Sequence, residues 1–242
     1  LLVITKPEVV RDIHRAYLES GADILETNTF NGTSIALADY EMGHLVRELN
    51  TAAVQVARQA VDAFKAAHPG KDAFVAGAIG PTNKTLSMSR DVNDSAKRDV
   101  TFVQVRDAYR EQVDALIDAG ADLLLCETVF DTLVLKAALF AIDEAFEARG
   151  FRLPLMISGT ITDASGRTLT GQTTESFWNS VRHAQPLSVG MNCALGGEQM
   201  RPHIAELAGK ADIYVSCYPN AGLPNPLSPT GFPEGPEDTA AI

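Results

Sequence analysis

"SGADILETNTF", residues 20–30, and "AGADLLLCETVF", residues 119–130, repeat one pattern at two places in this 242-residue chain. Each stretch has Gly-Ala-Asp, then an apolar run, then Glu-Thr at the end of that run. The glycine is typical of a helix end and the apolar run of a buried strand. A fainter third copy, "KADIYVSC", occupies residues 210–217. Recurring units of this kind favour an α/β fold of the (β/α)8 TIM-barrel type over a doubly wound sheet.

Short apolar runs alternate with amphipathic stretches along the rest of the chain. The runs expected to be strands are 22–27, 73–79, 121–128, 153–159, 187–193 and 211–217. The stretches expected to be helices are 7–19, 33–67, 101–119, 131–149, 174–184 and 197–209. Strands that are apolar on both faces are typical of a parallel sheet covered by helices. No Gly-x-Gly-x-x-Gly follows any of these strands, which argues against a dinucleotide-binding fold.

The predicted barrel is incomplete. A closed barrel of this type needs eight strands, and six alone would leave two edges unpaired. We therefore expect residues 1–242 to be a fragment of one barrel domain, with its first strand before Leu1 and its last after Ile242. Residues 219–242 are rich in proline and glycine. They predict a long loop on the C-terminal face of the barrel, with "TAAI" at the end as a possible first turn of a helix.

Composition excludes several classes of function. The formal net charge is −11, so the surface would repel nucleic-acid backbones and anionic lipid. No apolar stretch is long enough to span a membrane, and the first residues lack the features of a signal peptide. The three cysteines lie far apart, which favours a reducing compartment over a disulfide framework. We expect a cytoplasmic protein with no nucleic-acid or membrane partner.

The active site of such a barrel gathers at the C-terminal ends of its strands. The residues at or just beyond these ends, a set rich in amide, hydroxyl and carboxylate groups, are Glu26, Thr27, Asn28, Gly80, Pro81, Thr82, Asn83, Glu127, Thr128, Ser158, Gly159, Thr160, Asp163, Asn192, Cys193, Ser216, Cys217 and Asn220. None of the five histidines falls there, so we predict no residue acting as a catalytic acid or base. Strand alternation turns Cys126 away from Glu127 and predicts a core position for that thiol.

Two thiols, Cys193 and Cys217, stand at strand ends. A lone cysteine among apolar residues is most often an inert core residue. Zinc needs three or four ligands, usually cysteine or histidine, and this chain offers at most two thiols at suitable positions. Spacing alone therefore gives little support to a zinc site.

Several segments resemble one known family. They are "GADILETNTFNGTSIALADYEM", "VAGAIGPTNKTLSMSRDVND", "LLLCETVFDTLVLKAALFAI", "MISGTITDASGRTLTGQTTESFWNSVRHA", "VGMNCALGGEQMRPHI" and "VSCYPNAGLPN". Together they are similar to the homocysteine-binding domain of cobalamin-dependent methionine synthases, from about residue 1 to about residue 225. Betaine– and S-methylmethionine–homocysteine methyltransferases share that fold and site.

The resemblance implies a (β/α)8 barrel in which three cysteine thiolates hold zinc. Cys193 matches one of these ligands, whereas the adjacent Cys-Cys pair that supplies the other two is absent from this sequence. Cys217 matches none of them and is expected to be structural. Glu127 matches the glutamate that receives the amino group of the substrate, and Asn192 is expected to orient the amino acid. Glu26 holds the equivalent place in the first copy, where a hydrogen-bonding role at the barrel rim is at least as plausible.

The implied reaction belongs to methionine biosynthesis. Zinc would ionise the homocysteine thiol, and the thiolate would take a methyl group from methylcobalamin, carried with folate by other domains of the same longer polypeptide. Two alternatives stay open. The chain could use betaine or S-methylmethionine as methyl donor. It could also be a metal-free, inactive barrel fragment that at most binds an amino acid, because two thiolates are missing.

Overall fold

The structure is a computed structural model that describes residues 1–162 and 165–242, so the candidate Asp163 lies outside the described residues. The chain divides into two compact units. The first unit comprises Leu1–Cys126 and Leu133–Pro154, and the second comprises Glu127–Thr132 and Leu155–Ile242.

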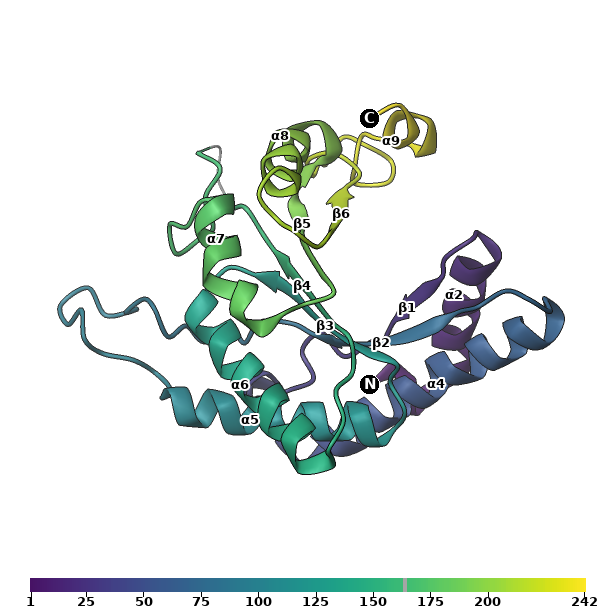
Figure 1. The fold of residues 1–242 in the computed structure, drawn as a ribbon, viewed down its shortest axis with the longest axis horizontal. Coiled ribbons are helices and arrows are strands. Elements are labelled where there is room, and N and C mark those ends of the chain that lie inside the picture. The colour runs from purple at the N-terminus through teal and green to yellow at the C-terminus, as the bar shows by residue number, and fades with distance from the viewer. Residues whose placement is uncertain (163–164) are drawn as a thin grey trace. The chain divides into compact units, whose positions relative to one another are not determined.

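The described residues form six strands and a larger number of helices (Figure 1). The strands are β1 (Ile24–Glu26), β2 (Phe74–Ile79), β3 (Leu123–Val129), β4 (Leu155–Gly159), β5 (Ser188–Gly196) and β6 (Tyr214–Asn220). The α-helices are α1 (Leu2–Thr5), α2 (Pro7–Glu19), α3 (Ser34–Leu37), α4 (Val46–Ala67), α5 (Phe102–Asp118), α6 (Thr132–Arg149), α7 (Thr174–Val181), α8 (Gly197–Ala208) and α9 (Pro236–Ala241). Three short 3-10 helices are η1 (Ala38–Tyr40), η2 (Gly43–Leu45) and η3 (Arg182–Ala184).

In the first unit, β1, β2 and the start of β3 are parallel neighbours in the order of the sequence. Helices α4 and α5 pack against β2, and α2 packs on α4. The core between them contains the apolar side chains of Val75, Val113, Leu116 and Leu124, none of which is accessible to solvent. The Thr101 side chain forms a capping box with Gln104 that fixes the start of α5.

In the second unit, the end of β3 is followed by β4, β5 and β6, again parallel and in sequence order. The Thr160 N–H donates to the Val129 carbonyl at 3.0 Å, which joins the ends of β3 and β4. Helix α8 lies beside β5 and β6, and α7 beside α8. A Cβ at Gly159 would come within 2.9 Å of the Phe177 ring, so the packing of α7 on β4 requires a glycine there.

These observations confirm the predicted fold class. Parallel strands that are neighbours both in sequence and in the sheet, each followed by a helix, are the arrangement of a (β/α)8 barrel. The described residues supply six of the eight strands that such a barrel contains.

The structure corrects three boundaries. Residues 33–67 are not one helix, because Glu41 adopts a left-handed conformation (φ 58°) that ends η1 and separates α3 from α4. Residues 219–242 are not loop throughout, since β6 runs to Asn220 and α9 occupies Pro236–Ala241, where Pro236 stands at the first helical position. Strand β5 continues beyond Cys193 to Gly196.

Helix α1 was not predicted. Its four residues are too few to show a period, so the sequence offered no sign of it. Among the residues described, no helix is both long and apolar enough to cross a bilayer.

Candidate active site

The three residues predicted to form the site, Glu127, Asn192 and Cys193, all belong to the second unit. Glu127 lies near the end of β3, and Asn192 and Cys193 lie in the later part of β5. Ser158 and Thr160 stand at the end of β4, between these two strands. The arrangement of the predicted residues can therefore be followed within one unit.

The side chain of Asn192 connects the ends of all three strands. Its Oδ1 accepts a hydrogen bond from the Thr128 N–H at 3.0 Å and another from the Ser158 hydroxyl at 2.7 Å. Its Nδ2 donates to the Thr128 Oγ1 at 2.8 Å. Asn192 is 2% exposed and Ser158 is inaccessible, so these bonds are buried. Buried hydrogen bonds of this kind are costly to break, which makes the network rigid.

Unusual backbone conformations mark the same strand ends. Thr128 (φ 56°), Cys193 (φ 45°) and Ala194 (φ 58°) all adopt positive φ values that side-chain-bearing residues rarely occupy. For a β-branched residue such as Thr128 the conformation is especially unfavourable, and strain of this type costs on the order of 1–3 kcal/mol. Such strain persists only where surrounding contacts hold it, and it clusters at functional sites.

Cys193 is half-buried in the later part of β5, which ends at Gly196. The Thr160 hydroxyl lies 3.4 Å from the Cys193 Sγ, within hydrogen-bonding distance for sulfur. Thr160 is 3% exposed, so its hydroxyl is held in place beside the sulfur. A half-buried thiol with a neighbouring hydroxyl can act as a ligand or a nucleophile, whereas a core cysteine cannot.

Glu127 is 8% exposed, and the adjacent Cys126 is 1% exposed. The core position predicted for Cys126 is thus confirmed. Glu127 stands directly before the strained Thr128 and keeps a small accessible surface. A carboxylate shielded from most of the solvent binds an ammonium group more strongly than an exposed one, because the charges are less screened.

The other strand-end thiol, Cys217, differs from Cys193. It is exposed, and its thiol donates to the Met200 Sδ at 3.4 Å. Desolvation raises the pKa of the Cys217 thiol, so the protonated form is favoured. A thiol must ionise to bind a metal, and Cys217 is therefore the poorer candidate ligand of the two.

A zinc site needs at least three protein ligands. In the part of the chain that the structure describes, no cluster of three or more His, Cys, Asp or Glu side chains could hold a metal ion. Cys193 thus stands as one candidate ligand without the partners that would complete a site. The described residues do not fit a zinc ion on their own.

The strand ends of the first unit carry hydroxyls in a different arrangement. The Thr27 and Thr29 hydroxyls lie 2.6 Å apart, the Thr29 hydroxyl donates to the Ala78 carbonyl, and the Thr27 Oγ1 accepts from the Ala78 N–H. Both threonines are buried, so these groups hold β1 to β2 rather than face a ligand. Glu26 is exposed, yet desolvation raises the pKa of its carboxyl group.

The sequence identified the residues at the strand ends but not the bonds between them. Asn192, Ser158, Thr128 and Thr160 were all recognised as strand-end polar residues, whereas the network through Asn192 and the left-handed backbone at Thr128 were not. No local sequence feature predicts a positive φ at a threonine, since glycine and asparagine are the residues that usually adopt the left-handed conformation.

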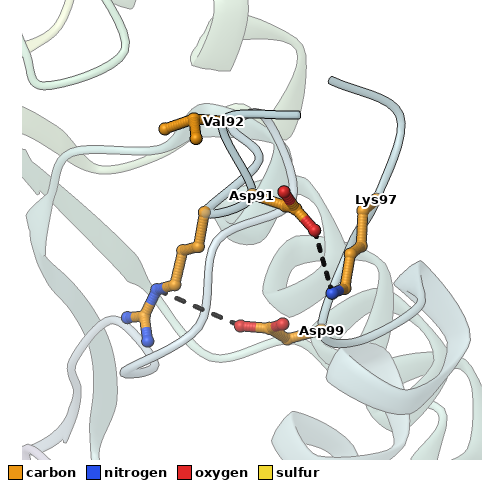
Figure 2. Close-up of a pocket in the computed structure, with 5 residues that line it drawn as sticks. Asp91, Val92, Lys97 and Asp99 are labelled. Carbon is orange, nitrogen blue, oxygen red and sulfur yellow. Dashed lines mark hydrogen bonds and ion pairs between the residues drawn. The ribbon is translucent and has the colours of Figure 1, made fainter. Parts of the chain in front are cut away.

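Away from these strand ends, a pocket lies in the loop between β2 and α5, lined by Arg90, Asp91, Val92, Lys97 and Asp99 (Figure 2). Its charges neutralise one another, because the Lys97 Nζ lies 3.1 Å from Asp91 and the Arg90 Nε lies 4.0 Å from Asp99. The Asn93 N–H and Lys97 lower the pKa of the Asp91 carboxyl group. In these exposed pairs each charged side chain of the pocket already has a partner of opposite charge, so the pocket gives no support to a ligand site.

Comparison with known proteins gives consistent matches. The family model described as homocysteine S-methyltransferase matches residues 1–242. The metallated form of the homocysteine methyltransferase MmuM from Escherichia coli is 25% identical, with a TM-score of 0.76 over 91% of this chain and 75% of that one. The oxidized form of MmuM is 24% identical, with a TM-score of 0.74 over 91% of this chain and 74% of that one.

Proposed function

Because this chain belongs to the homocysteine S-methyltransferase family, we propose that its second unit binds homocysteine and presents the substrate thiol for methylation. The observation that carries this proposal is the position of Glu127 and Cys193. A shielded carboxylate and an accessible thiol stand at strand ends of one unit, joined through Asn192. These are the groups that an amino acid with a sulfur-containing side chain would need.

The Glu127 carboxylate would accept charge-assisted hydrogen bonds from the substrate ammonium group. This contact fixes one end of homocysteine at the tip of β3. The sulfur of homocysteine would then point toward Cys193 and Thr160, at the ends of β5 and β4. The overall reaction forms a sulfur–carbon bond to the methyl group. The bond between donor and methyl breaks with its electron pair on the donor, and the thiol proton is lost.

Zinc activation of the substrate thiol is the part of the family resemblance that these residues do not support by themselves. The described residues provide one candidate thiolate, Cys193, where three are implied. We propose that Cys193 is one zinc ligand and that any complete site draws its other ligands from outside the described residues.

The methyl donor is also part of the proposal. The "TDASGRTLTGQTTE" and "PNAGLPN" segments favour methylcobalamin, delivered by another domain of a longer cytoplasmic polypeptide in methionine biosynthesis. A small-molecule donor, betaine or S-methylmethionine, is the second candidate, because the homocysteine methyltransferases that use these donors share the resemblance. Incubating the zinc-supplemented chain with homocysteine and either methylcobalamin, S-methylmethionine or betaine separates them. Methionine formed only from methylcobalamin supports the first candidate.

A third candidate belongs to another class, an amino-acid-binding fragment without catalysis. It is favoured by the lack of a three-ligand cluster among residues 1–162 and 165–242. In this case calorimetry would detect homocysteine binding, and methionine would form with none of the three donors even when the protein carries a full equivalent of zinc.

Glu127→Gln tests substrate binding directly, since it keeps the shape of the side chain and removes its charge. We expect the dissociation constant for homocysteine to rise about tenfold or more, because one charge-assisted hydrogen bond contributes on the order of 1.5–3 kcal/mol. Glu26→Gln is the matched control, as the same residue in the other copy of the repeat. An unchanged constant in Glu127→Gln would remove Glu127 from the site, and a large change in Glu26→Gln would move the ammonium contact to the first unit.

A further inference from the structure

Asn192 lies at the centre of the site, but its side chain is almost fully engaged by the protein. An asparagine amide offers two N–H donors and an oxygen with two lone pairs. The oxygen accepts from the Thr128 N–H and from the Ser158 hydroxyl, and one N–H donates to the Thr128 Oγ1. With 2% exposure, this side chain has little capacity left for a substrate.

We propose that Asn192 is a positioning residue, which holds Thr128 in its left-handed conformation and thereby sets the placement of both Glu127 and Cys193. This proposal rests on the proposed function for the identity of the substrate. It differs from the role expected from the sequence, in which Asn192 would contact the amino acid itself. The residues that bind substrate and metal would then depend on one buried amide that touches neither.

Thr128 is restrained directly by the Asn192 side chain. The Thr128 N–H and the Thr128 hydroxyl both bond to the Asn192 side chain. The backbone and the side chain of Thr128 are therefore held by one amide group. A β-branched residue does not remain at φ 56° without such restraint. Because φ at Thr128 sets the direction in which the chain leaves Glu127, loss of the restraint would let the Glu127 backbone turn.

Cys193 directly follows Asn192, and with Ala194 it forms a pair of residues with positive φ, 45° and 58°. The Ser158 hydroxyl, at 2.7 Å from the Asn192 Oδ1, fixes the start of this pair against β4. The same side chain therefore restrains the residue before the thiol and the residue after the carboxylate. A change at Asn192 should move the two groups together.

Conservative variants separate positioning from simple stability. Thr128→Val keeps the shape of the side chain but removes the oxygen that accepts from Asn192, whereas Thr128→Ser keeps that oxygen. Ser158→Ala removes the third bond. Thr173→Ala is a control for stability, because the Thr173 side chain caps α7 by accepting from the Ser176 N–H and lies outside the network.

The first measurement is homocysteine affinity by calorimetry, with the denaturation midpoint of each variant recorded alongside. We expect Asn192→Ala and Thr128→Val to weaken binding about tenfold, since each removes a bond that holds Thr128, and with it Glu127, in the binding position. Thr128→Ser should restore most of the affinity. Thr173→Ala should lower the midpoint and leave the affinity as it was.

The second measurement reports on Cys193 without substrate or metal. In a Cys217→Ser background Cys193 is the accessible thiol, because Cys126 is buried. The rate of its reaction with a thiol reagent should rise several-fold in Asn192→Ala and Ser158→Ala as the strand end loosens. Thr173→Ala should react at the rate of the background protein.

The outcomes distinguish the two proposals. If the unsubstituted chain binds no homocysteine, the proposed function fails, while the labelling rates still decide whether Asn192 positions Cys193. If Thr128→Val and Ser158→Ala keep both the affinity and the labelling rate within about twofold while their midpoints fall as in Thr173→Ala, Asn192 is structural only and the positioning role is overturned.

Discussion

The Thr160 hydroxyl lies 3.4 Å from the Cys193 Sγ and connects the end of β4 to the thiol at the end of β5. Either group can donate in this contact, so it holds the thiol beside the end of β4 in both cases. Thr160 is buried, so contacts with the surrounding protein hold its side chain in place.

We expect Thr160→Val to speed the alkylation of Cys193 a few-fold at neutral pH, since the isosteric side chain removes the polar contact that holds the thiol beside β4. Thr160→Ser should restore the rate. Iodoacetamide labelling in a Cys217→Ser background, followed by mass spectrometry, measures this effect. Equal rates for Thr160→Val and the background protein would show that the hydroxyl does not influence the thiol.

The zinc content of the chain tests the assignment of Cys193. We expect well under one equivalent of tightly bound zinc for residues 1–242, because one thiolate does not form a site. Weak binding measured at added zinc should be lost in Cys193→Ser and kept in Cys217→Ser. One full equivalent that survives dialysis would mean that residues other than those assigned complete a metal site.

Much of the fold could be predicted because its information is local. The pattern of a glycine followed by an apolar run predicted a helix end and then a strand. It occurs at Gly120, before β3, and at Gly21, before β1. The break between α3 and α4 was missed because buried residues continue on both sides of it, at Leu37 and Val46. Glu41, which makes the turn, is not a residue type that signals a left-handed conformation.

The site was harder to predict than the fold, because its geometry depends on contacts between distant residues. The sequence placed Asn192 and Thr128 at strand ends, but the bonds between them join positions 64 residues apart. Strand alternation correctly predicted that Cys126 lies in the core. It gave no indication that Thr160 would lie beside Cys193, which only the packing of β4 on β5 determines.

Burial of the His14 side chain should make the stability of the first unit depend on pH. His14 is 7% exposed, its Nε2 has no hydrogen-bond partner among the described residues, and burial lowers the pKa of the imidazole. The folded state therefore binds a proton less readily than the unfolded state, in which the pKa is about 6.5. Stability is fully present above that value and is lost as the pH falls through the lowered pKa of the folded state.

His14→Leu should remove this part of the pH dependence. We expect the denaturation midpoint of the variant to fall less between pH 7 and pH 5 than that of the unsubstituted protein. Urea unfolding followed by circular dichroism at several pH values measures the difference. Parallel pH profiles for the two proteins would show that other groups dominate the acid sensitivity.

Gly32 tests the packing of the loop that follows β1. A Cβ at this position would lie 2.6 Å from the Asn50 Oδ1, 2.7 Å from the Gln112 Nε2 and 2.8 Å from the Thr29 carbonyl oxygen. Asn50 and Gln112 cannot move aside cheaply, because the Asn50 Nδ2 donates to the Gly32 carbonyl at 2.8 Å and the Gln112 Nε2 donates to the Thr29 carbonyl at 2.8 Å. We expect Gly32→Ala to lower the free energy of unfolding by about 1–3 kcal/mol, as overpacking of a buried site does.

Gly43→Ala is the matched control, since the nearest atom to its added Cβ would be the Ser34 carbonyl oxygen at an ordinary 3.8 Å. Chemical denaturation of both variants measures the contrast, and a Gly32→Ala protein as stable as Gly43→Ala would show that the loop can shift without breaking the bonds of Asn50 and Gln112.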